Sequence, residues 1–199
     1  MKLLSQVRHA LFTLLGVFCL GGVAAAQNTS TPAPAAPAAV VAPRLQPSAR
    51  EVGERLVDAI IQVESQGDPQ RVGRAGERGL MQIRLTTWRE TTRGIFGRPQ
   101  PFQRAFDPAL NRRVGRAYLL RLQTQIAQHR TEWRADARAL LIAAYNAGPT
   151  LLVQKNFDLK KMPASTRDYV ERVINLHDAY LASRTAQLHQ QLATQVAAM

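Results

Sequence analysis

Residues 48–67 read SAREVGERLVDAIIQVESQG and predict an amphipathic helix from which the rest of the fold can be interpreted. Ser48 and Glu51 have the spacing of a capping box, which satisfies free amide donors at the start of a helix. Apolar residues then recur at helical spacing, so one face is expected to pack on a core. These residues are Val52, Leu56, Val57, Ile60, Ile61 and Val63. Gly67 predicts the end of the helix just beyond them.

Glu64 continues the apolar face of this helix, four residues after Ile60. Burial penalises the charged form of a carboxyl group, so a glutamate in such a row is expected to have a raised pKa. The spacing predicts that Glu64 lies in the last turn, at the mouth of a core. Spacing alone leaves open that Glu64 is a solvated residue at a frayed helix end.

Four more helices and one glycine-rich loop are predicted downstream. The loop carries Gly73, Gly76 and Gly79, and glycines at this density allow tight turns or the close approach of a ligand. The sequence has no convincing alternating pattern of a strand, so the predicted fold class is mainly α. The first of these helices is expected to begin with a cap near Thr86, and the second to begin at Pro108 with Asp107 as its N-cap. The third is expected to span Ala137–Ala147, and the fourth to begin after Pro163.

The composition is that of a globular chain with a strongly basic balance. The 199 residues include 26 Lys plus Arg against 14 Asp plus Glu, which gives a net charge of +12. The basic residues are scattered and form no nucleic-acid-reading motif, so no nucleic-acid partner is expected. The charge is interpreted as a solvated surface or as attraction to an anionic polymer such as cell wall.

The sequence also excludes several classes of site. The four histidines lie far apart and Cys19 is the only cysteine, which excludes a zinc finger, an iron–sulfur site and a disulfide scaffold. No metal and no cofactor is therefore expected. No run of 18 apolar residues lies outside the N-terminus, which excludes a protein with several membrane spans.

The N-terminus has the pattern of a signal peptide, residues 1–26. Lys2 and Arg8 form a basic start, an apolar run follows, and small alanines allow cleavage before Gln27. We therefore expect a periplasmic or secreted protein. The alternative is an uncleaved anchor, which would be the protein's only contact with the membrane.

Three further segments follow the signal peptide. Residues 27–47 are rich in proline and alanine and are interpreted as a linker. The helical pattern then predicts a domain at residues 48–182, and residues 183–199 are expected to form a helical tail.

Four motifs occur in order along the predicted domain. They read IQVES at 61–65, GLMQI at 79–83, AAYNAGP at 143–149 and TRDYV at 166–170. Together they strongly resemble the SLT-type lytic transglycosylases, bacterial enzymes with a goose-lysozyme-like helical fold that cut peptidoglycan. The resemblance covers about residues 50–180 and implies a helical domain with a groove for a glycan strand.

The resemblance also implies roles for residues in the first two motifs. Glu64 would be the catalytic acid and base, with Ser65 beside it in the active site. Met81 and Gln82 would line the glycan groove. The residues alone leave open that Ser65 is only a polar residue at a helix end and that Met81 is ordinary packing.

The last two motifs would supply aromatic and amide groups to the same site. By resemblance, Tyr145 and Asn146 would face Glu64 and the sugar, and the Tyr145 hydroxyl could orient the carboxyl group. Tyr169 would complete the wall of the site. Tyr145 could instead be a core aromatic residue whose hydroxyl is satisfied elsewhere.

The resembling family works with a single carboxylate. That residue protonates the leaving oxygen and then deprotonates the C6 hydroxyl of MurNAc, so the product is a 1,6-anhydro-MurNAc end formed without water. A glycosidic oxygen needs a proton donor near neutral pH, and the apolar row ending at Glu64 would supply the raised pKa. No cofactor is implied.

Two positions depart from the family pattern. Leu85 stands where the family commonly has proline, a change expected to be harmless. Glu77 stands where the family tends to have a small alanine, and it brings a second carboxylate near the site. Glu77 is expected to pair with the adjacent Arg74 or Arg78; it could instead activate a water or raise the pKa of Glu64 by like-charge repulsion.

Three functions therefore compete. The first is a lytic transglycosylase acting on peptidoglycan strands. The second is a water-using muramidase on the same fold, distinguished by a reducing product end. The third is a non-catalytic wall-binding component of a secretion apparatus, and a secretion or cell-wall machine is a candidate partner in any of these cases.

Overall fold

The structure is a computed structural model that describes residues 46–198. The predicted signal peptide and nearly all of the predicted linker lie outside these residues. Within them the fold is mainly α, as predicted, and the only β-type pairing consists of isolated bridges. The helices are α1 Ala49–Ser65, α2 Leu85–Phe96, α3 Pro108–Ala127, α4 Ala137–Ala147, α5 Pro149–Gln154 and α6 Ala164–Ala197, with short 3-10 turns η1 Phe102–Phe106, η2 Arg130–Glu132 and η3 Leu159–Lys161.

Most of the predicted helix starts are confirmed by their capping bonds. The Ser48 hydroxyl accepts from the Glu51 amide, and the Glu51 carboxylate accepts in return from the Ser48 amide. Asp107 caps α3, since its carboxylate accepts from the amide of Leu110 at 3.0 Å. The prediction of a capped start near Thr86 is wrong, because α2 begins at Leu85 after Arg84, which makes no side-chain cap bond.

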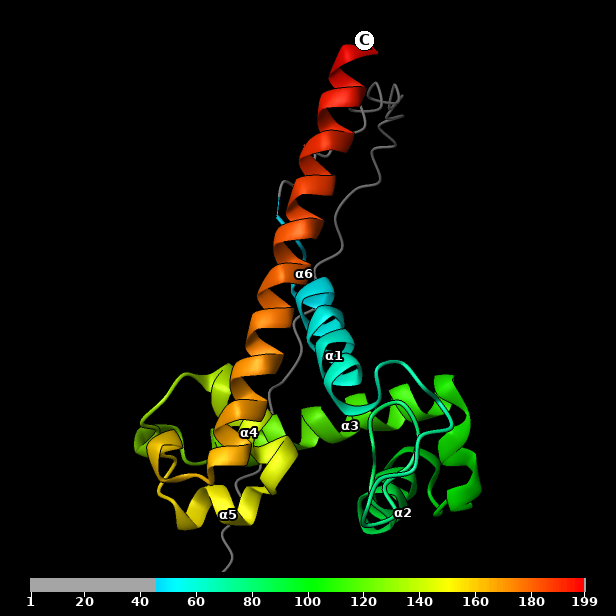
Figure 1. Ribbon diagram of the computed structural model, residues 1–199, viewed down its shortest axis with the longest axis vertical. Coiled ribbons are helices and arrows are strands. Elements are labelled where there is room, and N and C mark those ends of the chain that lie inside the picture. Colours follow the sequence, from blue (N-terminus) through cyan, green and yellow to red (C-terminus); the bar gives the residue numbers. More distant parts are fainter. Residues whose placement is uncertain (1–45, 199) are drawn as a thin grey trace, which may run out of the picture. The chain divides into compact units, whose positions relative to one another are not determined.

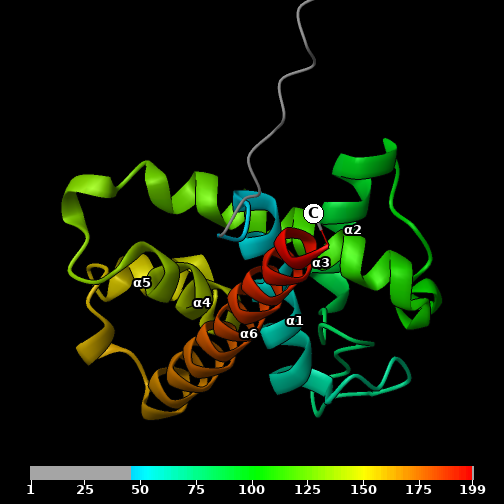
Figure 2. The same cartoon turned by 90° about the horizontal axis from the view of Figure 1, so that it is seen from above.

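The helices pack around one apolar core. Helix α1 lies along α6, and α4 lies between α3, α5 and α6, while α2 packs against α3 and η1 (Figure 1, Figure 2). Helix α4 is the most enclosed, since its residues 142–144 are all fully buried. The largest fully buried apolar side chains are Trp88, Phe157, Ile60, Met81, Leu122, Leu140, Ile142, Leu152 and Met162.

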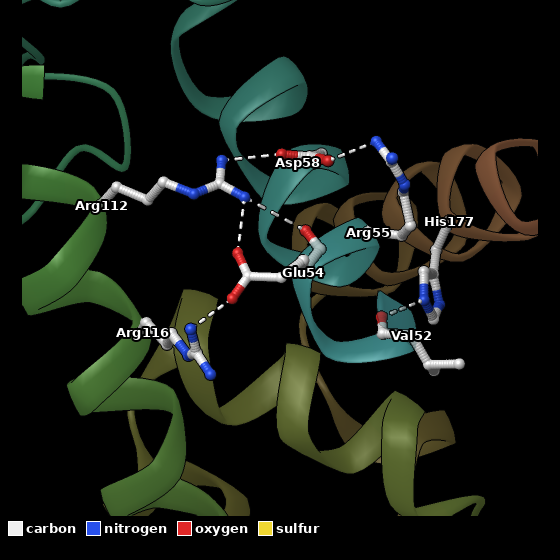
Figure 3. A network of polar contacts seen from close by, with 7 residues as sticks. All are labelled: Val52, Glu54, Arg55, Asp58, Arg112, Arg116 and His177. Carbon is white, nitrogen blue, oxygen red and sulfur yellow. Dashed lines mark hydrogen bonds and ion pairs between the residues drawn. The ribbon is translucent and has the colours of Figure 1, made fainter. Parts of the chain in front are cut away.

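An ion-pair network fixes α1 against α3 (Figure 3). Arg112 on α3 donates to Asp58 at 2.7 Å and to the Glu54 carboxylate at 2.9 Å, both on α1. Arg116 pairs with Glu54 as well, and Arg55 pairs with Asp58 at 3.0 Å. Each half-exposed pair stabilises little alone, but the network joins two successive turns of each helix and so fixes the axial position of α1.

Helix α6 runs without a break through residue 182, where the sequence predicts the end of the domain. Its buried residues end at His177, whose Nε2 lies 3.0 Å from the Val52 carbonyl of α1. Further along α6, Arg184 donates to Glu51 of α1. Among residues 46–198, no helix combines the length and apolar character needed to cross a membrane.

Candidate active site

A cleft of about 610 Å³ opens at the C-terminal end of α1. Its walls come from that helix end, from the loop before α2 and the first turn of α2, from α3, and from the region where α4 meets α5. The residues that line it are Glu64, Arg71, Gly73, Glu77, Gln82, Ile83, Arg84, Thr86, Thr87, Tyr118, Tyr145, Asn146, Ala147, Gly148, Leu151 and Thr166.

Glu64 lies in the last turn of α1, as the spacing predicts. The helix ends immediately after it because Gln66 adopts the left-handed conformation with φ of 57° and bonds back to Gln62. One carboxyl oxygen, Oε1, accepts a hydrogen bond of 2.7 Å from the Tyr169 hydroxyl. The other oxygen has no protein donor among the described residues, so it is the oxygen available to a ligand in the cleft.

The environment of Glu64 favours the protonated carboxyl. Burial raises its pKa to about 7, and the nearby negative charge of Glu77 acts in the same direction. The Tyr169 hydrogen bond and the charge of Arg172 oppose this shift, because both stabilise the carboxylate. A carboxyl group with this pKa can donate a proton and later accept one at neutral pH.

The floor of the cleft is a loop folded into three adjacent stretches. Val72 bridges to Arg78, and Arg78 bridges to Ile83 on its other side. To the cleft this loop presents Ile83 and the polar set Arg71, Gly73, Glu77, Gln82 and Arg84.

Asn111 of α3 holds this loop in place. Its buried side chain accepts from the Met81 amide at 2.9 Å and donates to the carbonyls of Arg78 and Ala105 at 3.0 and 2.7 Å. The Met81 side chain is fully buried and packs where a Cβ on Gly115 would lie. Loop and helix therefore meet without room for a larger residue at position 115.

The rings of two tyrosines in the cleft pack against each other in a tilted arrangement. The rings of Tyr118 and Tyr145 have centroids 5.6 Å apart and are inclined by 52°. The Tyr145 hydroxyl donates to the Met81 carbonyl at 2.7 Å and so ties α4 to the loop. The carboxyl-orienting bond expected of Tyr145 is made instead by Tyr169, which lies in the second turn of α6.

Glu77 lies in the same cleft as Glu64, but its partner differs from the expected one. Oε1 of Glu77 accepts from Nε of Arg84 at 3.1 Å, and Oε2 accepts from the Ala75 amide at 2.9 Å. The expected pairing with Arg74 or Arg78 is wrong, since Arg78 is turned to the other face, over the ring of Phe102. These donors hold the pKa of Glu77 below its usual value against the effect of burial.

The structure brings most of the predicted site residues together. Gln82, Tyr145 and Asn146 line the cleft with Glu64, and the buried Tyr169 stands behind the carboxyl group. Gln82 has φ of 44° and donates to the carbonyls of Arg71 and Gly79, so its amide also braces the loop.

Ser65 and Met81 occupy positions that differ from the implied groove-lining role. Ser65 is 2% exposed, and its hydroxyl bonds to the Ile61 carbonyl and the Gly67 amide at the helix end. Met81 is 0% exposed and contributes to the site through its carbonyl, which receives the Tyr145 hydroxyl. Both residues support the cleft rather than line it.

Sequence reasoning missed several cleft residues. Tyr118 lies at helical spacing with the apolar residues of α3, and nothing in that spacing marks it as facing a groove. Arg71, Arg84, Thr86 and Thr87 were not predicted as cleft residues.

No group of three or more His, Cys, Asp or Glu within residues 46–198 has the arrangement of a metal site. The acid of the cleft is Glu64, and polar side chains surround it.

Comparison with known proteins places this geometry in a family. Residues 45–168 match the profile of the Transglycosylase SLT domain family. The Endo-type membrane-bound lytic murein transglycosylase A of Cronobacter sakazakii is 33% identical over 141 residues, which are 67% of this chain and 69% of that protein. The protein of the same name from Citrobacter koseri is 31% identical over the same shares of the two chains.

A solved structure agrees with the fold. The X-ray structure of an inactive Glu-to-Gln mutant of the lytic transglycosylase Slt from Pseudomonas aeruginosa matches with a TM-score of 0.55 and 29% sequence identity. The match covers 69% of this chain and 23% of the Pseudomonas chain, so this chain corresponds to less than a quarter of that larger protein.

Proposed function

The chain belongs to the Transglycosylase SLT domain family, and from this premise we propose that it is a peptidoglycan lytic transglycosylase. Its substrate is the glycan strand of peptidoglycan, and it cuts the β-1,4 bond between MurNAc and GlcNAc. The product is a strand that ends in 1,6-anhydro-MurNAc. The observation that carries the proposal is a partly buried carboxyl group, Glu64, whose pKa is raised to about 7 in an open cleft.

Glu64 acts first as an acid. Its proton passes to the glycosidic oxygen as the bond from that oxygen to C1 of MurNAc breaks, and an oxocarbenium-like centre develops at C1. The carboxylate left behind is stabilised by the Tyr169 hydroxyl at 2.7 Å. Tyr169 is therefore a positioning residue that acts through Glu64.

Glu64 then acts as a base. It removes the proton from the C6 hydroxyl of the same MurNAc, whose oxygen bonds to C1 and closes the anhydro ring. The proton lost in the first step is thereby recovered, so the enzyme returns to its starting state without water. A pKa near the working pH suits both directions of transfer.

The other cleft residues hold the strand. Tyr118 and Tyr145 offer an aromatic surface for a sugar face, and Asn146 and Gln82 offer amide groups for hydroxyls and N-acetyl groups. Ser65 and Met81 keep the helix end and the loop in position.

A water-using muramidase is the second candidate, because Glu77 places another carboxylate in the cleft. Both Glu77 oxygens already accept hydrogen bonds, from Arg84 and from the Ala75 amide, which favours a fixed anion over a base that moves with a water. A non-catalytic wall-binding role gains no support from a cleft that retains a partly buried acid with a raised pKa.

The test is mass spectrometry of the muropeptides released from purified sacculi. We expect mainly anhydro ends from the natural protein, the same ratio from Glu77→Ala, and no release by Glu64→Gln. Mainly reducing ends that convert to anhydro ends in Glu77→Ala would establish the muramidase instead. Lysis by a folded Glu64→Gln protein would contradict the assignment of the acid.

The proposed site of action is outside the cytoplasmic membrane, where peptidoglycan lies. We propose that residues 1–26 direct export and are cleaved before Gln27. Intact-mass measurement of the exported protein tests this: a species that retains Met1 in the membrane fraction would show an anchor.

A further inference from the structure

The cleft carries two arginines for which a glycan backbone offers no charged partner. Arg71 and Arg84 both line the cleft with Glu64. In peptidoglycan the lactyl group of MurNAc is joined to a peptide through an amide, so neither sugar is charged. A charged side chain on a binding surface favours ligands that carry the opposite charge.

The loop fold brings the two arginines to one face. The stretch that carries Arg71 and the stretch that leads to Arg84 lie on either side of the Glu77 stretch, since Gly79 donates to the Arg71 carbonyl and Arg78 pairs with Ile83. The resulting row reads positive, negative, positive. Gly73 makes room for it, because a Cβ there would collide with the Glu77 carboxylate.

The guanidinium groups retain donors for a ligand. Arg84 is 68% exposed and uses its Nε for Glu77, so its two terminal nitrogens have no acceptor among the described residues. Arg71 is exposed and forms no ion pair within residues 46–198. Guanidinium groups bind carboxylates in paired, directional contacts.

We propose that Arg71 and Arg84 bind the carboxylates of the stem peptide on the reacting MurNAc, so that the enzyme prefers peptide-bearing strands. The geometry is consistent with the chemistry of the substrate, because the peptide is attached to the same sugar whose C1 reacts beside Glu64. This inference rests on the proposed function and adds a substrate class to it.

Two substrates separate this inference from its premise. Uncrosslinked strands that keep their peptides are compared with the same strands after an amidase has removed the peptides, and kcat/KM is measured for each by anhydro ends released. The natural protein is expected to prefer the peptide-bearing strands. Failure to release anhydro ends from either substrate would contradict the proposed function, whereas equal rates on both would contradict only the peptide site.

The variants Arg71→Gln and Arg84→Gln test the residues. Each is expected to lower the ratio of the two kcat/KM values by about three- to tenfold, the loss typical of a charged contact in a solvated cleft. Arg74→Gln is the matched control: it removes an exposed arginine from the same loop outside the cleft, and the ratio should stay unchanged.

Arg71→Gln is the more direct variant, because Arg84→Gln also releases Glu77 from its partner. An equal loss on both substrates would assign the arginines to the lactyl carboxylate that amidase exposes, or to the sugars, and would overturn the peptide assignment. An equal fall in the ratio for Arg74→Gln would show a general charge effect and would overturn it as well.

Discussion

Replacing Tyr169 by phenylalanine removes one hydroxyl from the site and leaves the ring that is packed in the core. That hydroxyl donates to Glu64 Oε1 at 2.7 Å and favours the carboxylate, so its loss should raise the pKa of Glu64 above about 7. A hydrogen bond to a charged group stabilises by about 1.5–3 kcal/mol. At 1.36 kcal/mol per pKa unit this corresponds to a rise of about one to two units.

The same bond has a second effect on the rate. The carboxylate forms as the proton moves to the glycosidic oxygen, so an unsupported carboxylate raises the barrier of that step. We expect kcat at the optimum to fall by about tenfold, the effect of 1.4 kcal/mol. The high-pH limb of the profile should move upward at the same time, since the acid stays protonated to higher pH.

The assay is a pH profile of anhydro-end release from sacculi, with a thermal melt at each pH. Tyr145→Phe is the matched control, because its hydroxyl donates to the Met81 carbonyl instead of Glu64. It should leave the high-pH limb near its natural position. A Tyr169→Phe protein with normal turnover and an unmoved limb would refute the role of this hydroxyl.

Three further outcomes are expected. Glu64→Gln should raise the free energy of unfolding at pH 8 by up to about 3 kcal/mol. The folded-state pKa of Glu64 lies above its ordinary value of 4.5, so the natural protein loses stability as pH rises from 4.5 through about 7. A flat response in melts from about pH 4 to 8 would contradict the raised pKa. Glu77→Gln should move the high-pH limb of activity to lower pH, since it removes a negative charge near Glu64 and leaves Arg84 unpaired; an unmoved limb would show that Glu77 does not act on the acid. Burial and the charge of Arg138 lower the pKa of His177, so the unfolded chain binds the proton of this residue more readily than the folded one. The free energy of unfolding should therefore fall as pH drops below about 6.5. Urea titrations of His177→Gln should show a smaller fall, and an identical fall would assign the effect to other groups.

Most helices could be predicted from the sequence because the patterns that specify them are local. The apolar row of α1 and its capping box lie within 20 residues, and Asp107 with Pro108 marks the start of α3 through bonds that span three residues. The continuous apolar run at Ala137–Ala147 predicted α4 with its observed bounds. The start of α2 was misjudged because no side chain caps it.

The details of the site depended on contacts that spacing does not encode. Glu64 could be found because it extends an apolar row, but the choice between the hydroxyls of Tyr145 and Tyr169 depends on how α4 and α6 dock. The partner of Glu77 was misassigned because proximity in sequence suggested Arg74 and Arg78. In the folded loop Arg78 lies over the ring of Phe102, and the pairing of Arg78 with Ile83 brings Arg84, seven residues from Glu77, to the carboxylate.

The pairing of α1 with α6 determines when activity can first appear as the chain folds. Glu64 and Tyr169 are 105 residues apart in sequence, and α1 lies along the last helix of the chain. Such long-range contacts form late, because the entropy of closing the intervening chain must be overcome first. A chain that emerges N-terminus first would present Glu64 long before Tyr169. Until then, Glu64 would lack both the hydroxyl and the buried environment that tune its pKa. The activity would therefore require that the segment from Glu64 through Tyr169 has folded, and a chain that stops short of Tyr169 would lack the tuned acid.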